Sequence, residues 1–67
     1  MTKLEKAINE AGYTKKEFAY IIGIESSNLF GFFYNPEKIK KMRVKKAMQM
    51  AMALKISMEE LLEMGDE

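Results

Sequence analysis

The amino-acid sequence predicts a compact all-α domain of five short helices. Apolar residues recur at helical spacing in every long segment, and no segment alternates between apolar and polar residues like a strand. Glycine or Asn-Pro stop signals separate the first four helical segments, and the connections between all five are brief. With 67 residues the chain is expected to be one domain, residues 1–67, ending in a short acidic tail at residues 63–67.

The first two expected helices are defined by their apolar face and by a capping signal. The first covers residues 2–11. The second begins at Thr14, which can cap the helix and form a capping box with Glu17 three residues later. Tyr13 and Phe18 flank this cap at the spacing of a hydrophobic staple.

A very short turn at residues 23–25 leads to the third expected helix, which begins near Glu25 and ends near Tyr34 at the Asn35-Pro36 stop signal. Two short helices joined by such a turn, with a glycine in it, are typical of a helix-turn-helix. An ordinary corner between two helices of a small bundle has the same spacing, so both interpretations stay open at this point.

The last two helices complete the domain. The fourth is expected over residues 42–54, and the fifth begins at Ser57, which forms a second capping box with Glu60. Leu61 and Leu62 are the expected core positions of this last helix.

Composition excludes several kinds of function. The chain has no Cys and no His, which excludes disulfides, thiolate chemistry and the usual zinc sites. We therefore expect no metal, no cofactor and no enzymatic activity. No segment is long and apolar enough to span a bilayer, so the protein is expected in the cytoplasm and off the membrane. A chain of this size has no room for a second, small-molecule-binding domain, so no such ligand is expected.

Charge is segregated along the chain although the net charge is only +1. The segment from Ser57 onward carries only acidic charges. Six of the nine residues 38–46 are basic, namely Lys38, Lys40, Lys41, Arg43, Lys45 and Lys46. Such a run makes a local positive field that the net charge conceals.

Two stretches of the chain resemble one family. TKKEFAYIIGIESSNLFGFF, residues 14–33, resembles the helix-turn-helix of the lambda-repressor-like, Cro-type (XRE) transcriptional regulators. MAMALKISMEELL, residues 50–62, resembles the closing pattern of that family. The residues that carry the resemblance are Phe18, Ala19, Gly23, Ile24, Glu25 and Leu29 in the first stretch, and Ala51, Leu54, Ile56, Ser57, Leu61 and Leu62 in the second.

The resemblance implies a five-helix lambda-repressor-like DNA-binding domain with its helix-turn-helix at the second and third helices. It also implies a sequence-specific transcriptional regulator, a repressor that occupies an operator. The small size resembles the Cro-like proteins of phages and other mobile elements. Many family members pair an Arg of the first helix with a Glu of the third, but here Ile8 and Phe33 occupy those positions. We expect both to be core residues, because apolar side chains can replace a buried ion pair.

The resemblance divides the third helix into two faces. Leu29, Phe32 and Phe33 have the spacing of an inward stripe. In a helix-turn-helix the amino-terminal residues of the second helix contact base edges. The expected base-reading residues are Ser26, Ser27, Asn28 and Phe30.

Two positions of the third helix allow several roles. Phe30 could contact a thymine methyl, form a dimer contact, or be a partly covered surface residue. Gly31 could allow the backbone to approach DNA closely, or could simply weaken the helix.

Basic residues on both sides of the third helix are expected to contact phosphates rather than only to keep the surface soluble. The basic residues of the run at 38–46 directly follow the expected base-reading helix. The expected phosphate contacts are Lys15, Lys16, Lys38, Lys40, Lys41 and Arg43, while Lys45 and Lys46 are left open.

The expected partner is double-stranded DNA with an inverted repeat, bound by a homodimer, because one such domain makes too few base contacts for tight binding. Val44, Met48 and Met52 are the candidate dimer interface, although the methionines could instead fill the core. The alternative is a protein-interaction module on the same fold, antirepressor-like or antitoxin-like, without DNA readout. The low net charge, Gly31 and the aromatic residues Phe30 and Tyr34 favour that alternative.

Overall fold

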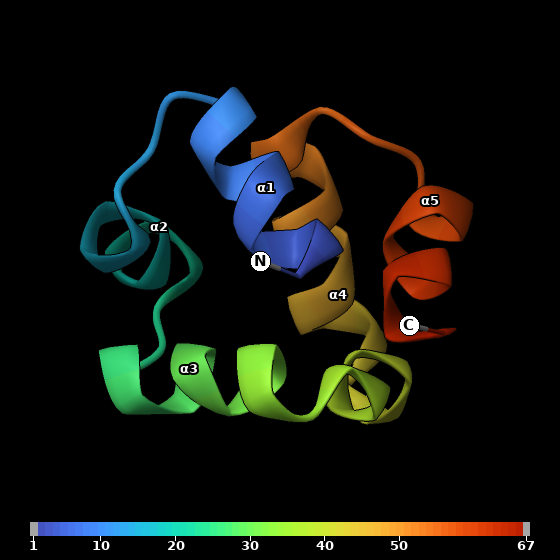
Figure 1. The fold of residues 1–67 in the computed structure, drawn as a ribbon. Helices are drawn as coiled ribbons and strands as arrows, with labels where there is room; N and C mark the ends of the chain where they lie inside the picture. The colour runs from blue at the N-terminus through green and yellow to red at the C-terminus, as the bar shows by residue number, and fades with distance from the viewer. Residues whose placement is uncertain (1, 67) are drawn as a thin grey trace.

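The chain folds as a series of short helices joined by turns (Figure 1). A computed structural model describes residues 2–66, and every regular element in that range is helical, which confirms the all-α prediction. The α-helices are α1 (Lys3–Glu10), α2 (Lys15–Ile22), α3 (Ser26–Tyr34), α4 (Val44–Leu54) and α5 (Met58–Glu63), and the 3₁₀ helices are η1 (Pro36–Lys41) and η2 (Met64–Asp66). The domain is nearly isometric, with extents of 23, 22 and 21 Å.

Three of the α-helices share the same amino-terminal cap. A Thr or Ser oxygen accepts the N–H of a Glu three residues later, and the Glu carboxylate accepts the N–H of the capping residue. The pairs are Thr2 with Glu5, Thr14 with Glu17, and Ser57 with Glu60. The second and third confirm the sequence predictions, while the first was not predicted although TKLE has the same spacing.

A single hydrophobic core occupies the centre of the domain. Ile8 and Phe33 are both buried in it, which confirms the expectation that they are core residues. Phe32 is half-buried and packs against the core. The buried core residues are Leu4, Ile8, Phe18, Ala19, Ile22, Leu29, Phe33, Ile39, Ala47, Met50, Ala51, Leu54 and Leu61.

One expectation about the core was wrong. The side chain of Leu62 is 39% exposed and does not belong to the buried core, because it is one residue after the inward-facing Leu61 and is therefore rotated by about 100° around the helix. The sequence analysis also did not predict η1, a helix within the basic run that is anchored by the buried residue Ile39.

The end of the described chain is packed against η1. Glu63 closes α5, and residues 64–66 form η2, in which Gly65 is buried. A Cβ on Gly65 would lie 3.1 Å from Cγ of Lys40 and 3.2 Å from the carbonyl oxygen of Pro36, so a side chain here would require these neighbours to shift by a few tenths of an ångström. Of the expected acidic tail, Glu67 lies outside the described residues.

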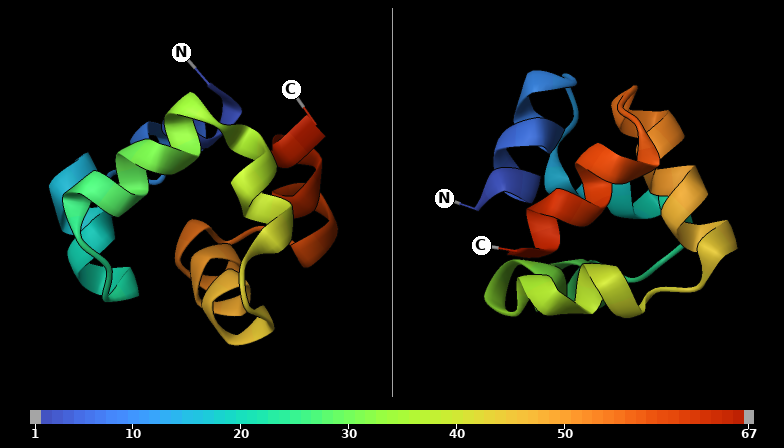
Figure 2. Two further views of the ribbon diagram at one scale, coloured as in Figure 1. Left: turned by 90° about the horizontal axis from the view of Figure 1, so that it is seen from below. Right: turned by 90° about the vertical axis from the view of Figure 1, so that its right-hand side faces the viewer.

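The arrangement places α3 and η1 together on one face of the molecule. Both lie along the lower side in Figure 1 and in front of the other elements when the domain is seen from below (Figure 2, left). The chain reaches α3 from α2 through the short turn at residues 23–25, where Gly23 has a φ of +82°. Glycine adopts this left-handed conformation without strain, so α2 can end abruptly there.

Candidate nucleic-acid interface

Helix α3 presents an outward face opposite its buried stripe. Leu29 and Phe33 face the core. At 100° per residue, Ser27, Gly31 and Tyr34 point in the opposite direction, since they are spaced i, i+4 and i+7. This line of three residues is the centre of the surface that α3 offers to a ligand.

The first turn of α3 is open to solvent. Ser26, Ser27 and Asn28 are all exposed, as expected for residues that bond a ligand. Glu25 precedes them at the cap position and makes no side-chain capping bond. The polar groups of Ser27 and Asn28 are therefore accessible at the amino end of the helix.

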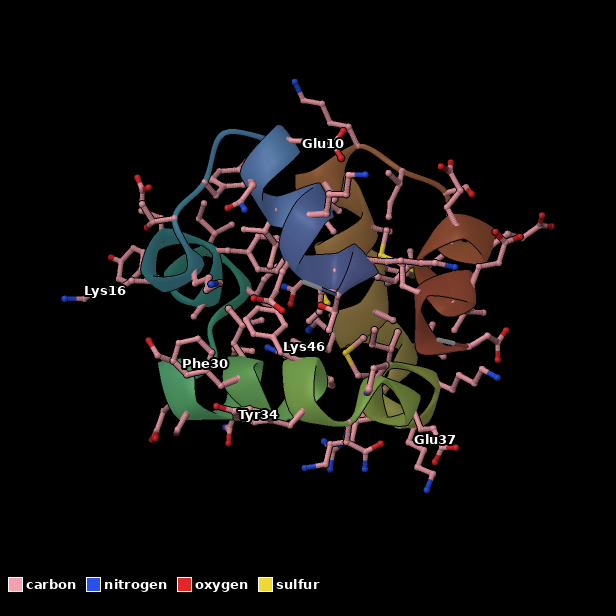
Figure 3. All side chains as sticks on the ribbon, in the orientation of Figure 1. Glu10, Lys16, Phe30, Tyr34, Glu37 and Lys46 are labelled. Atoms are coloured by element: carbon pink, nitrogen blue, oxygen red, sulfur yellow. The ribbon has the colours of Figure 1, made fainter. Side chains whose placement is uncertain are left out.

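The side chain of Phe30 is 42% exposed and lies against its own helix. Its ring centroid is 5.7 Å from that of Phe33, the buried residue three positions later on the same helix. Phe30 is thus a partly covered surface residue, and its exposed part can still contact a ligand. It lies beside the central line of the outward face, not on it (Figure 3).

Tyr34 is the residue of α3 that the sequence analysis did not include among the site residues. It is 88% exposed and ends the outward line at the last turn of the helix (Figure 3). Its spacing of seven residues from Ser27 was the signal that could have identified it. A tyrosine hydroxyl is one of the groups that bond phosphate oxygens in protein–DNA complexes.

The cations of the site differ in what they already contact. Lys15 forms an ion pair with Glu5, with 3.3 Å between Nζ and Oε2, and its Nζ lies 5.8 Å from the centre of the Phe33 ring. Lys40 forms an ion pair with Asp66. Lys46 donates a hydrogen bond of 2.9 Å to the carbonyl oxygen of Ile22, and so ties the start of α4 to the end of α2.

The remaining expected phosphate contacts are exposed. Lys16 extends away from the body of the domain at the start of α2 (Figure 3). Lys38 and Lys41 lie on η1, and Arg43 precedes α4. The unexpected helix η1, which carries Lys38, Lys40 and Lys41, lies on the same side of the domain as α3.

The carboxylates of two capping boxes have lowered pKa values. The pKa of Glu17 is lowered because its carboxylate accepts a hydrogen bond from the backbone N–H of Thr14. The pKa of Glu5 is lowered chiefly by the backbone N–H of Thr2, and the nearby ammonium of Lys15 acts in the same direction. Both carboxylates are therefore held in the charged form at the amino ends of their helices.

The candidate dimer interface is an apolar stripe on α4. Val44, Met48 and Met52 recur every four residues and are 68%, 49% and 74% exposed. The possibility that these methionines fill the core is therefore excluded, because the core side of α4 is made by other residues. The stripe is a surface without a partner among the described residues.

No group of three or more acidic side chains that could hold a metal ion occurs within residues 2–66. No helix in the same range is long and apolar enough to cross a membrane. Comparisons of the chain with protein-family models, with curated proteins and with solved structures found no match.

Proposed function

We propose that this chain is a sequence-specific DNA-binding transcriptional regulator of the lambda-repressor-like, Cro-type class. In this proposal α2 and α3 form the helix-turn-helix, and α3 enters the major groove. The observation that carries the proposal is that α3 and η1 lie on one side of the domain, with exposed polar residues at the start of α3 and the lysines of η1 beyond its end. A helix is needed to reach base edges, and cations next to it are needed to hold the backbone.

The residues of this face have different tasks. Ser27 and Asn28 are placed to bond base edges, and asparagine can bond adenine through two hydrogen bonds. The lysines of η1 and Arg43 are placed to contact phosphates, which fix the position of the protein but carry no sequence information. Tyr34 and Lys16 extend the contacts to the backbone on either side of the groove.

A homodimer is proposed as the unit that binds the operator. Two copies would place two α3 helices in successive major grooves, about 34 Å apart. The α4 stripe of Val44, Met48 and Met52 is the proposed contact between copies, because these exposed apolar residues are neighbours on one helix face, and contiguous apolar patches mark interaction surfaces. Occupation of the operator would then repress transcription by excluding polymerase.

One observation favours a second function. Tyr34 and Phe30 expose aromatic surface on the same side of α3, and aromatic residues are enriched where proteins bind proteins. A protein-interaction module, with a protein instead of DNA on this face, is the alternative. It predicts no salt-dependent affinity for DNA and loss of the partner on Phe30→Ala.

Selection from a random duplex library at two salt concentrations tests the proposal. An enriched inverted repeat, with half-site centres about 10 base pairs apart, is the expected result. Absence of enrichment, together with no retention of DNA at low salt, would contradict the proposal and favour the protein partner.

Substitutions then separate the two kinds of contact. Asn28→Ala and Ser27→Ala are expected to relax the preference at individual base pairs. Lys41→Ala is expected to weaken binding to all sequences and to reduce the slope of log K against log salt by about 0.9. Lys6→Ala, at an exposed lysine of α1, is the control that removes the same charge outside this face.

A further inference from the structure

The middle of the outward face of α3 has no side chain of its own. Gly31 lies between Ser27 and Tyr34 on this face, inside a helix where glycine is unfavourable relative to alanine. It is nevertheless half-buried, so another group covers it. A Cβ placed on Gly31 would lie 3.4 Å from Nζ of Lys38, which identifies the covering group.

The path from Gly31 to Lys38 is fixed by the backbone. The N–H of Asn35 donates to the carbonyl oxygen of Gly31 at 3.0 Å, and the N–H of Lys38 donates to the carbonyl oxygen of Asn35 at 3.0 Å. The next residue, Ile39, is buried in the core and anchors η1. The base of the Lys38 side chain is therefore held in place, and its aliphatic part leads back over α3.

The ammonium of Lys38 has no carboxylate partner within residues 2–66. Lys15 and Lys40 are paired with carboxylates, and Lys46 donates to a carbonyl oxygen. A lysine ammonium carries three N–H donors. Those of Lys38 remain available at the point where a side chain of residue 31 would otherwise meet the groove.

We propose that Lys38 takes the place of a side chain at position 31 and reads the acceptor edge of a guanine in the major groove. This inference rests on the proposed function. It changes the role of Lys38 from a phosphate contact to a specificity-determining residue. Guanine is the expected base because its N7 and O6 acceptors are the groups that lysine bonds in the major groove. It also explains Gly31, since a longer side chain would displace the ammonium.

The test is the same library selection with four variants. Lys38→Ala is expected to lose the preference for guanine at one base pair of each half-site, by about fivefold or more, while the other positions keep theirs. Gly31→Ala is expected to retain the preference, because a Cβ at 3.4 Å from the ammonium is in ordinary contact. Gly31→Gln is expected to change the preferred base at that same pair, since the longer side chain occupies the position of the ammonium. Lys41→Ala is the matched control, with a uniform loss of affinity.

Each outcome is decisive. In the first outcome, the wild-type protein enriches a site and Lys38→Ala prefers the same base at every position, with only weaker binding and a smaller salt slope. That outcome overturns the inference and leaves the proposed function standing. A wild-type protein that enriches no site overturns both. Circular dichroism melting of each variant confirms that it is folded, which is expected because none of the three substituted positions is among the buried residues of α3 and η1.

Discussion

The ammonium of Lys40, on η1, is paired with the carboxylate of Asp66, in η2. The two residues are 26 positions apart in the sequence, and their pairing ties the end of the described chain to the face that carries α3. Both side chains are about half exposed, so solvent and salt screen the pair. A DNA phosphate at Lys40 would therefore compete with Asp66 for the same cation.

Asp66→Asn is expected to increase the affinity for DNA. Removing the competing carboxylate frees Lys40, and an exposed ion pair of this kind contributes up to about 1 kcal/mol, which corresponds to an increase of up to about fivefold. The gain is expected at low salt and should shrink as ionic strength rises. Titrations of the selected operator at two salt concentrations measure it.

The control for this prediction is Glu10→Gln, which makes the same change in net charge at the opposite end of the molecule (Figure 3). An equal gain in both variants would show that overall charge is responsible and that the pair with Lys40 has no special role. A gain in Asp66→Asn alone supports the competition.

Gly65→Ala is expected to destabilise the fold by about 1–2 kcal/mol. The added methyl group would lie 3.1 Å from Cγ of Lys40 and 3.2 Å from the carbonyl oxygen of Pro36, and the backbone oxygen cannot move without shifting η1. Urea unfolding measures the change in the free energy of unfolding. Asp66→Asn separates the clash from the loss of the ion pair, since it removes only the pair. Equal stability of Gly65→Ala and the wild-type protein would mean that η2 is not packed against η1 in solution.

Much of the fold could be predicted from local sequence signals. Capping boxes and the helical period depend on residues three or four positions apart, so Thr14 with Glu17 and Ser57 with Glu60 were recognisable without a structure. Helix η1 was missed because its single buried residue, Ile39, is surrounded by lysines that give it no apolar period. Leu62 was misplaced because two adjacent leucines do not indicate which of them faces inward.

The candidate site could be predicted only in part. Exposure of Ser27 and Asn28 followed from their distance from the inward stripe of α3. The contacts of the lysines could not be inferred, because Lys40 meets Asp66 and Lys46 meets Ile22 across long separations in the sequence. The position of Lys38 above Gly31 depends in the same way on the turn between α3 and η1.

Stability is expected to fall with acid as the capping-box carboxylates are protonated. The folded-state pKa of Glu17 and that of Glu5 are both below the ordinary value of 4.5. A lowered folded-state pKa stabilises the fold above the unfolded-state value, and this contribution is lost as the pH falls through the folded-state value. Thermal melts between pH 7 and pH 3 should therefore show a decrease in Tm that begins near this ordinary value.

Glu17→Gln tests the cause of this acid dependence. Glutamine can still accept the N–H of Thr14, but it cannot titrate, so the decrease in Tm with acid should be smaller than in the wild-type protein. Glu59→Gln, an exposed glutamate outside the capping pairs, is the matched control and should keep the wild-type profile. Identical profiles for Glu17→Gln and the wild-type protein would contradict the assignment.

Met52→Glu is expected to abolish dimerisation without unfolding the domain. Met52 is the most exposed residue of the α4 stripe, so a charge there costs little in the monomer but would be buried without a partner between two copies. Sedimentation equilibrium should give the monomer mass at concentrations where the wild-type protein is a dimer, and binding to a full operator should fall toward that of one half-site. Tyr20→Glu, at an equally open aromatic residue on α2, is the control and should remain dimeric. A dimeric Met52→Glu would place the contact between copies away from α4, and loss of the dimer only in Tyr20→Glu would assign it to α2.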